Sequence, residues 1–110
     1  MPASFLLKKA SDHQFYFVLT AENNEPILTS QTYTTKAGAQ GGIQSVRDNS
    51  TQDHLYERKQ AADGSHAFIL KSANGEPIGR SQTYPYLDAA ERWVAAVKRV
   101  ARRAPIREDI

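Results

Sequence analysis

The chain has 110 residues, a length that suits a single domain with one hydrophobic core. Its 14 basic and 12 acidic residues give a formal net charge of +2, so the charge balance points to no particular polyanionic partner. The absence of cysteine excludes disulfides and thiol chemistry and suits the cytoplasm, and no run approaches the roughly 20 apolar residues of a membrane span.

The sequence contains two copies of one segment. The run Glu25–Tyr33 reappears almost unchanged as Glu76–Tyr84, 51 positions later, and the same register continues on both sides without a gap. A copy of about 50 residues would hardly bury enough apolar surface to offset its chain entropy. The copies should therefore fold together, and two are too few for an open solenoid. We predict one domain, residues 1–110, with repeats 4–53 and 54–110 related by a pseudo-twofold axis.

The first copy predicts three strands and a helix. Phe5–Lys9 is the first strand, and Gln14–Thr20, rich in aromatic and β-branched residues, is the second. A third strand around Ile27–Ser30 begins after Pro26, where a missing backbone N–H is tolerated. Residues 35–48 then place apolar side chains three and four positions apart, which predicts an amphipathic helix.

The second copy repeats this order. Leu55–Lys59 and His66–Lys71 are the equivalent first and central strands. Asn74-Gly75 is a tight-turn dipeptide at the position of two asparagines in the first copy, so both copies should form the same hairpin. A final helix is predicted over Leu87–Arg102. Ile106–Glu108 matches the start of the first strand one period earlier, so a short C-terminal strand is expected.

These patterns predict an α+β fold with a single antiparallel sheet and two helices. They also resemble the YegP-like family of small bacterial proteins of unknown function. The residues that carry the resemblance are Phe15–Leu19, Glu25–Ser30, Tyr33, Ile43–Arg47, Asn49, Asn74–Gly79 and Ser81–Tyr84. It implies a β-β-β-α unit used twice, with one sheet across the copies and C-terminal strands exchanged between them.

Some members of that family have one unit and pair as dimers, which implies that a duplicated chain satisfies the contact internally. We therefore expect a monomer. The chain departs from the family pattern where Arg92-Trp93 replaces the small Gly41-Gly42 of the first copy. The resemblance supplies no established activity.

The repeated Ser-Gln-Thr-Tyr run offers hydroxyl and amide groups at equivalent positions in the two copies. Its candidate binding residues are Ser30, Gln31, Tyr33, Ser81, Gln82 and Tyr84. The two runs could form paired ligand pockets. Alternatively, they end the third strand, hydrogen-bond within the turn to the helix and pack each tyrosine ring under its helix.

The central strands carry apolar side chains on both faces. If Phe17 and Phe68 face the helices, alternation turns a second set of side chains to the opposite face. That set is Tyr16, Val18, Ala67 and Ile69. Two helices cannot cover both faces, so sheet curl, exchanged strands, a partner chain or a peptide must cover this one. We therefore expect a non-enzymatic interaction module that binds a protein or peptide partner through its sheet face or edge.

The C-terminal helix is basic. Its cations are Arg92, Lys98, Arg99, Arg102 and Arg103. They could contact phosphates, and Trp93 could stack on a base. Cations near the C-terminus of a helix are also stabilising without any ligand, and acidic Glu108 and Asp109 follow shortly after. Weak nucleic-acid binding is the first alternative function.

Catalytic and metal signatures are absent from the sequence. His13, His54 and His66 have no partner at the spacing of a helical or hairpin metal pair, so no metal site is predicted. No segment presents a serine, base and acid in a recognisable frame, and no glycine-rich loop has the setting of a phosphate site. We predict no catalytic residue and no cofactor, and keep a small-molecule enzyme as the second alternative.

Overall fold

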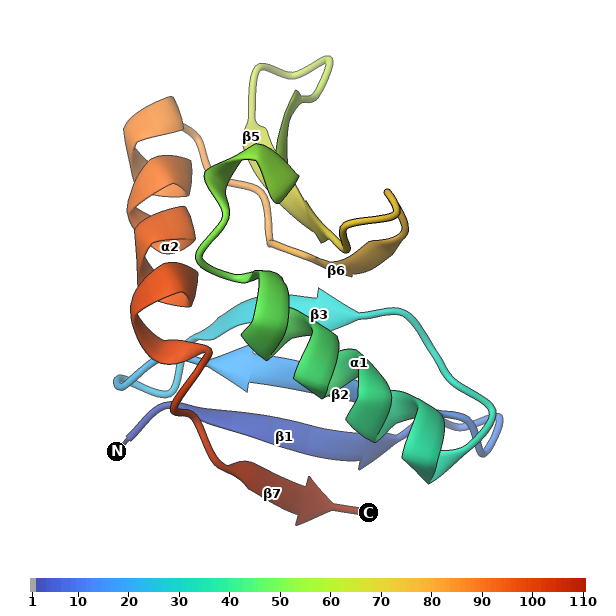
Figure 1. The fold of residues 1–110 in the computed structure, drawn as a ribbon. Helices are drawn as coiled ribbons and strands as arrows, with labels where there is room; N and C mark the ends of the chain where they lie inside the picture. Colours follow the sequence, from blue (N-terminus) through green and yellow to red (C-terminus); the bar gives the residue numbers. More distant parts are fainter. Residues whose placement is uncertain (1) are drawn as a thin grey trace.

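In the computed structural model, which describes residues 2–110, each copy forms three strands followed by one helix (Figure 1). The strands are β1 (Ser4–Lys9), β2 (Phe15–Thr20), β3 (Pro26–Ser30), β4 (Tyr56–Gln60), β5 (His66–Lys71), β6 (Pro77–Arg80) and β7 (Ile106–Asp109). The helices are α1 (Lys36–Asn49) and α2 (Leu87–Val100), and a 3₁₀ turn, η1 (Asp53–Leu55), precedes β4. The predicted α+β fold is confirmed, with α2 ending two residues earlier than expected.

The seven strands form one sheet in the order β4-β5-β6-β3-β2-β1-β7. The copies meet at its centre, where β3 and β6 pair antiparallel through Thr29↔Arg80 and Ser30↔Gly79. At one edge, β7 of the second copy pairs with β1 of the first, which is the exchanged strand that the resemblance implied. This pair is parallel, so the sheet is mixed and not wholly antiparallel. α2 returns the chain to the end where β1 begins, and the two strands start side by side there.

The hairpin turns have the same backbone geometry in both copies. Positive φ angles occur at His13 (68°) and Asn24 (69°) in the first copy, and at Gly64 and Gly75 (both 88°) 51 positions later. Glycine adopts this left-handed region without a Cβ clash, and asparagine tolerates it better than most residues. In all four turns this residue directly follows an aspartate or asparagine whose side chain accepts a hydrogen bond from the N–H two positions later. The Asn74-Gly75 dipeptide predicted one of these turns.

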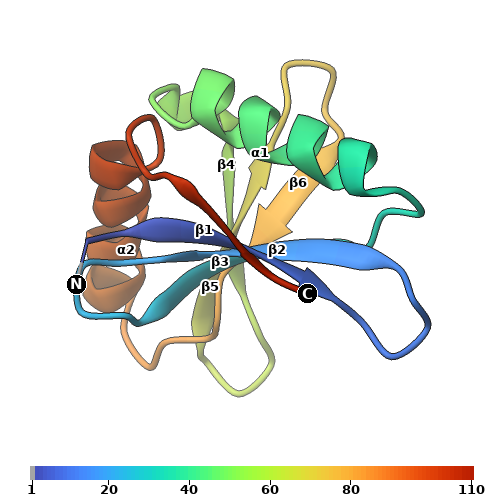
Figure 2. The same ribbon diagram turned by 90° about the horizontal axis from the view of Figure 1, so that it is seen from below.

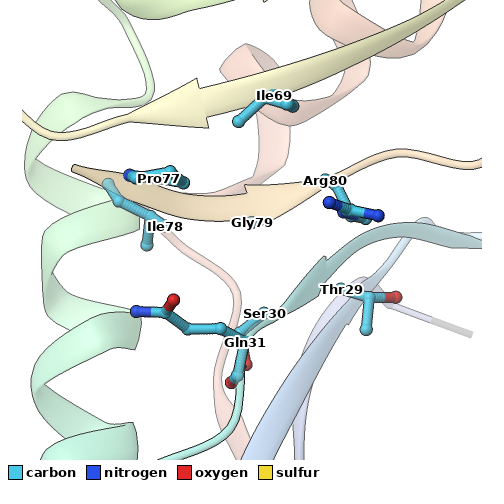
Figure 3. Close-up of a pocket in the computed structure, with 8 residues that line it drawn as sticks. All are labelled: Thr29, Ser30, Gln31, Ile69, Pro77, Ile78, Gly79 and Arg80. Atoms are coloured by element: carbon cyan, nitrogen blue, oxygen red, sulfur yellow. The ribbon is translucent and has the colours of Figure 1, made fainter. Parts of the chain in front are cut away.

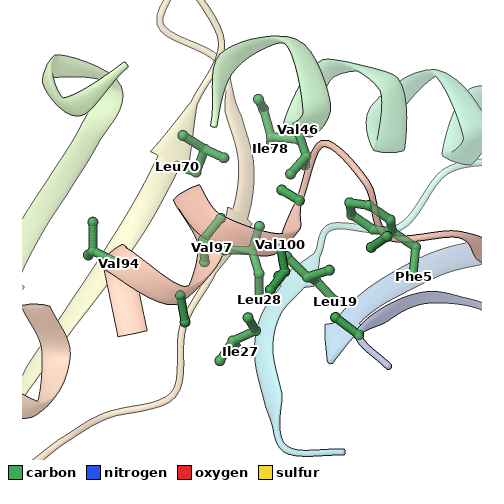
Figure 4. Packing of buried hydrophobic residues seen from close by; sticks show 14 of the residues in the cluster. Phe5, Leu19, Ile27, Leu28, Val46, Leu70, Ile78, Val94, Val97 and Val100 are labelled. Carbon is green, nitrogen blue, oxygen red and sulfur yellow. The ribbon is translucent and has the colours of Figure 1, made fainter. Parts of the chain in front are cut away.

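Each helix packs on strands of both copies. α1 contacts β1, β2 and β6, whereas α2 contacts β5 and β3. Figure 2 shows the strands of the first copy running across those of the second, with α1 along one side of the crossing strands and α2 along another. Figure 4 shows side chains of both copies meeting around α2. The fully buried side chains include Phe5, Phe17, Leu19, Ile43, Val46, Phe68, Leu70, Val94 and Val97. The copies therefore share one core.

No helix within residues 2–110 is both long enough and apolar enough to cross a membrane.

Gly41→Ala and Gly42→Ala in α1 should change stability in opposite directions. A Cβ at Gly41 meets nothing within 4 Å, so alanine should add about 1 kcal/mol of helix propensity. A Cβ at Gly42 would stand 2.8 Å from Tyr33 Cζ and 2.9 Å from Phe17 Cε2. Such overpacking costs about 1 to 3 kcal/mol and should outweigh the propensity gain. Urea midpoints that move in the same direction for both variants would contradict this packing.

Candidate functional site

Each serine of the Ser-Gln-Thr-Tyr run holds the central strand of its own copy. Ser30 Oγ accepts a hydrogen bond from the Phe17 N–H at 2.9 Å and donates one to the Gln31 carbonyl at 2.7 Å. Ser81 makes both bonds at the same distances in the second copy. Because both serine hydroxyls already form hydrogen bonds within the fold, their role is to position the run. The glutamine side chains of the run are the ones left to contact other groups.

Tyr33 and Tyr84 lie under the helices. Tyr33 stacks on Phe17 with ring centroids 6.4 Å apart and planes 13° apart. Tyr84 stacks on Trp93 of α2 at 6.4 Å and 22°. Burial raises the pKa of both phenols. Trp93 stands at the position of Gly42. In the first copy, the missing Cβ of Gly42 lets the Tyr33 ring approach α1 closely, whereas in the second copy Tyr84 stacks on an aromatic side chain of α2.

The outer face is the side of the sheet that α1 and α2 leave uncovered. Tyr16, Val18, Ala67 and Ile69 lie on it, and each is half-buried. Two of them have a long, charged cross-strand neighbour, with Lys8 opposite Tyr16 and Arg80 opposite Ile69. The stems of such side chains cover apolar surface while their charged ends stay in water. The chain therefore covers part of this face with its own side chains.

A cleft of about 340 Å³ opens at the centre of the sheet, where β3 meets β6. We call it the seam cleft; it is lined by Thr29, Ser30, Gln31, Ile69, Pro77, Ile78, Gly79 and Arg80. Figure 3 shows Arg80 and Thr29 at one end and the Gln31 side chain turned toward Ile78. Ile69, Pro77 and Ile78 supply apolar contacts. Arg80 is exposed and forms no ion pair within residues 2–110.

A second cleft, of about 470 Å³, lies across the pseudo-twofold axis. We call it the Gln82 cleft; it is lined by Leu6, Lys8, Tyr16, Val18, Thr20, Asn24, Pro26, Thr29 and Gln82. Val18, Pro26 and Gln82 are one period away from Ile69, Pro77 and Gln31 of the seam cleft, and Thr29 lines both clefts. One hydrogen bond distinguishes the two glutamines, because Gln82 Nε2 donates to the Pro26 carbonyl at 3.1 Å and Gln31 makes no such bond to Pro77.

The structure therefore brings together two sets of candidate residues that were identified separately in the sequence. Of the predicted residues, Ser30, Gln31 and Ile69 line the seam cleft, and Tyr16, Val18 and Gln82 line the Gln82 cleft. The others line neither cleft: Tyr33, Ala67, Ser81 and Tyr84. Sequence reasoning missed Thr29, Pro77 and Arg80. They lie in the duplicated segment, but their meeting depends on the pairing of β3 with β6 between copies, for which a single strand carries no signal.

The basic residues of α2 and of the turn that follows it differ in whether they have an acidic partner. Lys98 Nζ lies 2.7 Å from Asp53 Oδ1, and Arg99 Nη2 lies 3.0 Å from Glu22 Oε1. The remaining three are exposed and form no ion pair in the part of the chain that the structure describes: Arg92, Arg102 and Arg103.

The histidines lie apart from these clefts. His13 occupies a hairpin turn, His54 lies in η1, and the His66 N–H donates to the Tyr84 carbonyl at 2.7 Å. Across residues 2–110, no group of three or more histidine, aspartate or glutamate side chains is placed to hold a metal ion.

Comparison with known proteins identifies the same duplicated architecture elsewhere. The family "Domain of unknown function (DUF1508)" matches residues 10–57 and again 61–108. The UPF0339 protein YegP of Escherichia coli K12 is 50% identical over 98 residues, which cover 89% of each chain. The UPF0339 protein PA0329 of Pseudomonas aeruginosa is 47% identical over 109 residues, 99% of each chain.

Two solution NMR structures have the same fold. That of E. coli yegP, a protein of unknown function, superposes with a TM-score of 0.93 at 45% identity and covers 99% of this chain and 94% of that one. That of the UPF0339 protein SO3888 from Shewanella oneidensis gives 0.92 at 39% identity, with 98% and 92% covered.

Proposed function

The chain belongs to the UPF0339 (YegP) family of tandem DUF1508 domains, and we propose that it is a non-enzymatic binding module that holds an extended segment of a partner protein in its two outer-face clefts. The observation that carries this proposal is the relation between the clefts. Each combines side chains of both copies, and the two share Thr29 at the centre of the sheet. A segment that crosses the centre of the sheet would contact both.

The composition of the seam cleft supports a peptide ligand. Its volume of about 340 Å³ is in the range of ligand pockets, and it combines apolar walls with a few polar groups. The unpaired Arg80 guanidinium would favour an acidic side chain on the segment. Ile69 and Pro77 would contact an apolar side chain next to it.

We further propose that the protein acts as a cytoplasmic monomer. The duplication supplies both halves of the sheet within one chain, and β7 already covers the edge of β1. The two outer strands of the sheet, β4 and β7, carry charged side chains, which discourage pairing between edges.

Ile69→Glu and Arg80→Gln are expected to weaken capture of the partner from a bacterial lysate by about tenfold or more, as substitutions at the centre of an interface do. The bait would be the full chain, and captured proteins would be identified by mass spectrometry. Thr51→Glu, in the exposed connection after α1, is the matched control. Circular dichroism would establish that every variant is folded.

A protein that binds the wild type and Thr51→Glu but neither cleft variant would support the proposal. Tyr16→Glu, in the Gln82 cleft, should weaken the same protein, because both clefts would hold one segment. A captured protein whose binding is unaffected by all three outer-face changes would contradict the proposal. Retention of a small molecule near Gln31 instead of a protein would favour the enzyme alternative.

A further inference from the structure

α2 carries its charges on two different flanks. On one flank, Arg58 joins Asp53 and Glu91 at 2.9 Å each, and Lys98 joins Asp53 at 2.7 Å. The hydrogen bonds from Arg58 and Lys98 hold the pKa of the Asp53 carboxyl at about 2, so it remains an anion near neutral pH. Asp53 and Glu91 are therefore already paired with cations, and Lys98 is held on this flank.

The other flank is hollow and basic. Arg92, Trp93, Ala96 and Arg99 line a depression of about 300 Å³. A second depression, of about 330 Å³, is lined by Pro2, Ala3, Glu22, Arg99, Val100, Arg103, Ala104 and Pro105. Arg99 lines both, so the two depressions lie next to each other along α2, and we call them together the α2 groove. Its only acidic lining residue within the described chain is Glu22, and that carboxylate is already paired with Arg99 at 3.0 Å.

The spacing of cations in the groove suits a chain of phosphates. Arg92, Ala96 and Arg99 lie at i, i+4 and i+7, so they share one stripe of α2. The helical rise places Arg92 and Arg99 about 10 Å apart along the axis. Arg103 extends the row into the turn after α2, and the small Ala96 side chain leaves room between the guanidinium groups.

Trp93 gives the groove an aromatic wall. Its ring is half-buried and stacks on Tyr84 at 6.4 Å, which fixes its orientation, and its remaining surface lines the same depression as Arg92 and Arg99. A cationic groove that follows a backbone, next to an aromatic side chain that contacts bases, is the arrangement by which proteins bind single strands. A duplex keeps its bases stacked and would offer none to Trp93.

From this arrangement we propose that the α2 groove binds single-stranded nucleic acid, with phosphates on Arg92, Arg99 and Arg103 and a base against Trp93. The inference is independent of the peptide-binding proposal, because the groove and the outer-face clefts have no lining residue in common. Glu22 competes with the phosphate for Arg99, so binding should be moderate and strongly salt-dependent.

The test is a titration of the full chain with a fluorescein-labelled single-stranded RNA of about 12 nucleotides, a length within the usual site sizes. Binding would be followed by anisotropy at several salt concentrations. An unlabelled oligonucleotide of the same sequence would then be used to follow Trp93, the single tryptophan of the chain, so quenching of its fluorescence reports on this groove alone. Arg92→Gln with Arg103→Gln should weaken binding at low salt by about tenfold or more and lower the salt slope by about 1.4, because each phosphate contact on a single strand contributes about 0.7.

Lys9→Gln with Arg107→Gln is the control, because it removes the same charge from exposed positions outside the groove. Salt-dependent binding with Trp93 quenching, lost in the groove variant and kept in the control, would support the proposal. Equal loss in both variants would overturn it in favour of diffuse charge attraction. Equal affinity for a duplex of the same sequence would overturn the assignment to single strands, and saturation without quenching would place the ligand elsewhere.

Discussion

Phe17→Ala is expected to lower the free energy of unfolding by about 3 to 5 kcal/mol, and Phe68→Ala by a similar amount. The two residues are equivalent in the duplication, and both side chains are fully buried. Phe17 meets Phe5 edge to face at 5.9 Å, and Phe68 meets Tyr56 in the same way at 5.9 Å. Removal of either ring leaves a cavity that the surrounding sheet and helix cannot fill.

The Phe17→Ala variant also tests whether the two copies share one core. Trp93 fluorescence reports on the second copy, whereas far-ultraviolet circular dichroism reports on the whole chain. With one core, Phe17→Ala should shift the urea midpoint of both signals equally, although Phe17 lies in the first copy. A Trp93 transition that keeps the wild-type midpoint would show two independent units and contradict the shared core. Phe17→Leu removes less volume and provides the same test if the alanine variant does not fold.

The order of elements could be predicted because the duplication gave every pattern twice. Weak signals in one copy, such as the His13 turn, are matched by strong ones in the other, such as the turn at Gly64. The direction of β7 could not be predicted in this way. Its sequence matches the start of a first strand, but whether it pairs parallel or antiparallel depends on the end of the sheet to which α2 returns the chain.

The candidate sites could be predicted only in part, because they depend on contacts between copies. Gln31 and Ile69 were identified separately, and only the pairing of β3 with β6 places them in one cleft. The basic helix shows the same limit. Lys98 and Arg99 find their carboxylate partners 45 and 77 residues away, so the sequence could not tell which cations of α2 remain available.

Tyr56→Phe is expected to lower the free energy of unfolding by about 1 to 3 kcal/mol, because it leaves a buried acceptor without its donor. Tyr56 Oη donates a hydrogen bond of 2.6 Å to the Ser50 carbonyl, and both residues are buried. The equivalent residue of the first copy, Phe5, has no hydroxyl. A wild-type midpoint in urea for Tyr56→Phe would contradict the assigned role of this bond.

The same variant gives a test at alkaline pH. Burial raises the pKa of the Tyr56 phenol, so the folded chain holds it neutral where the unfolded chain releases its proton. The phenol is neutral in both states below about pH 10, and its stabilising contribution decreases as the pH rises above that value. Tyr56→Phe lacks this ionisation, whereas the buried Tyr33 and Tyr84 affect both proteins alike. The gap in stability between wild type and variant should therefore narrow from neutral pH to about pH 11. A gap that stays constant would mean that the Tyr56 phenol ionises equally well in the folded chain.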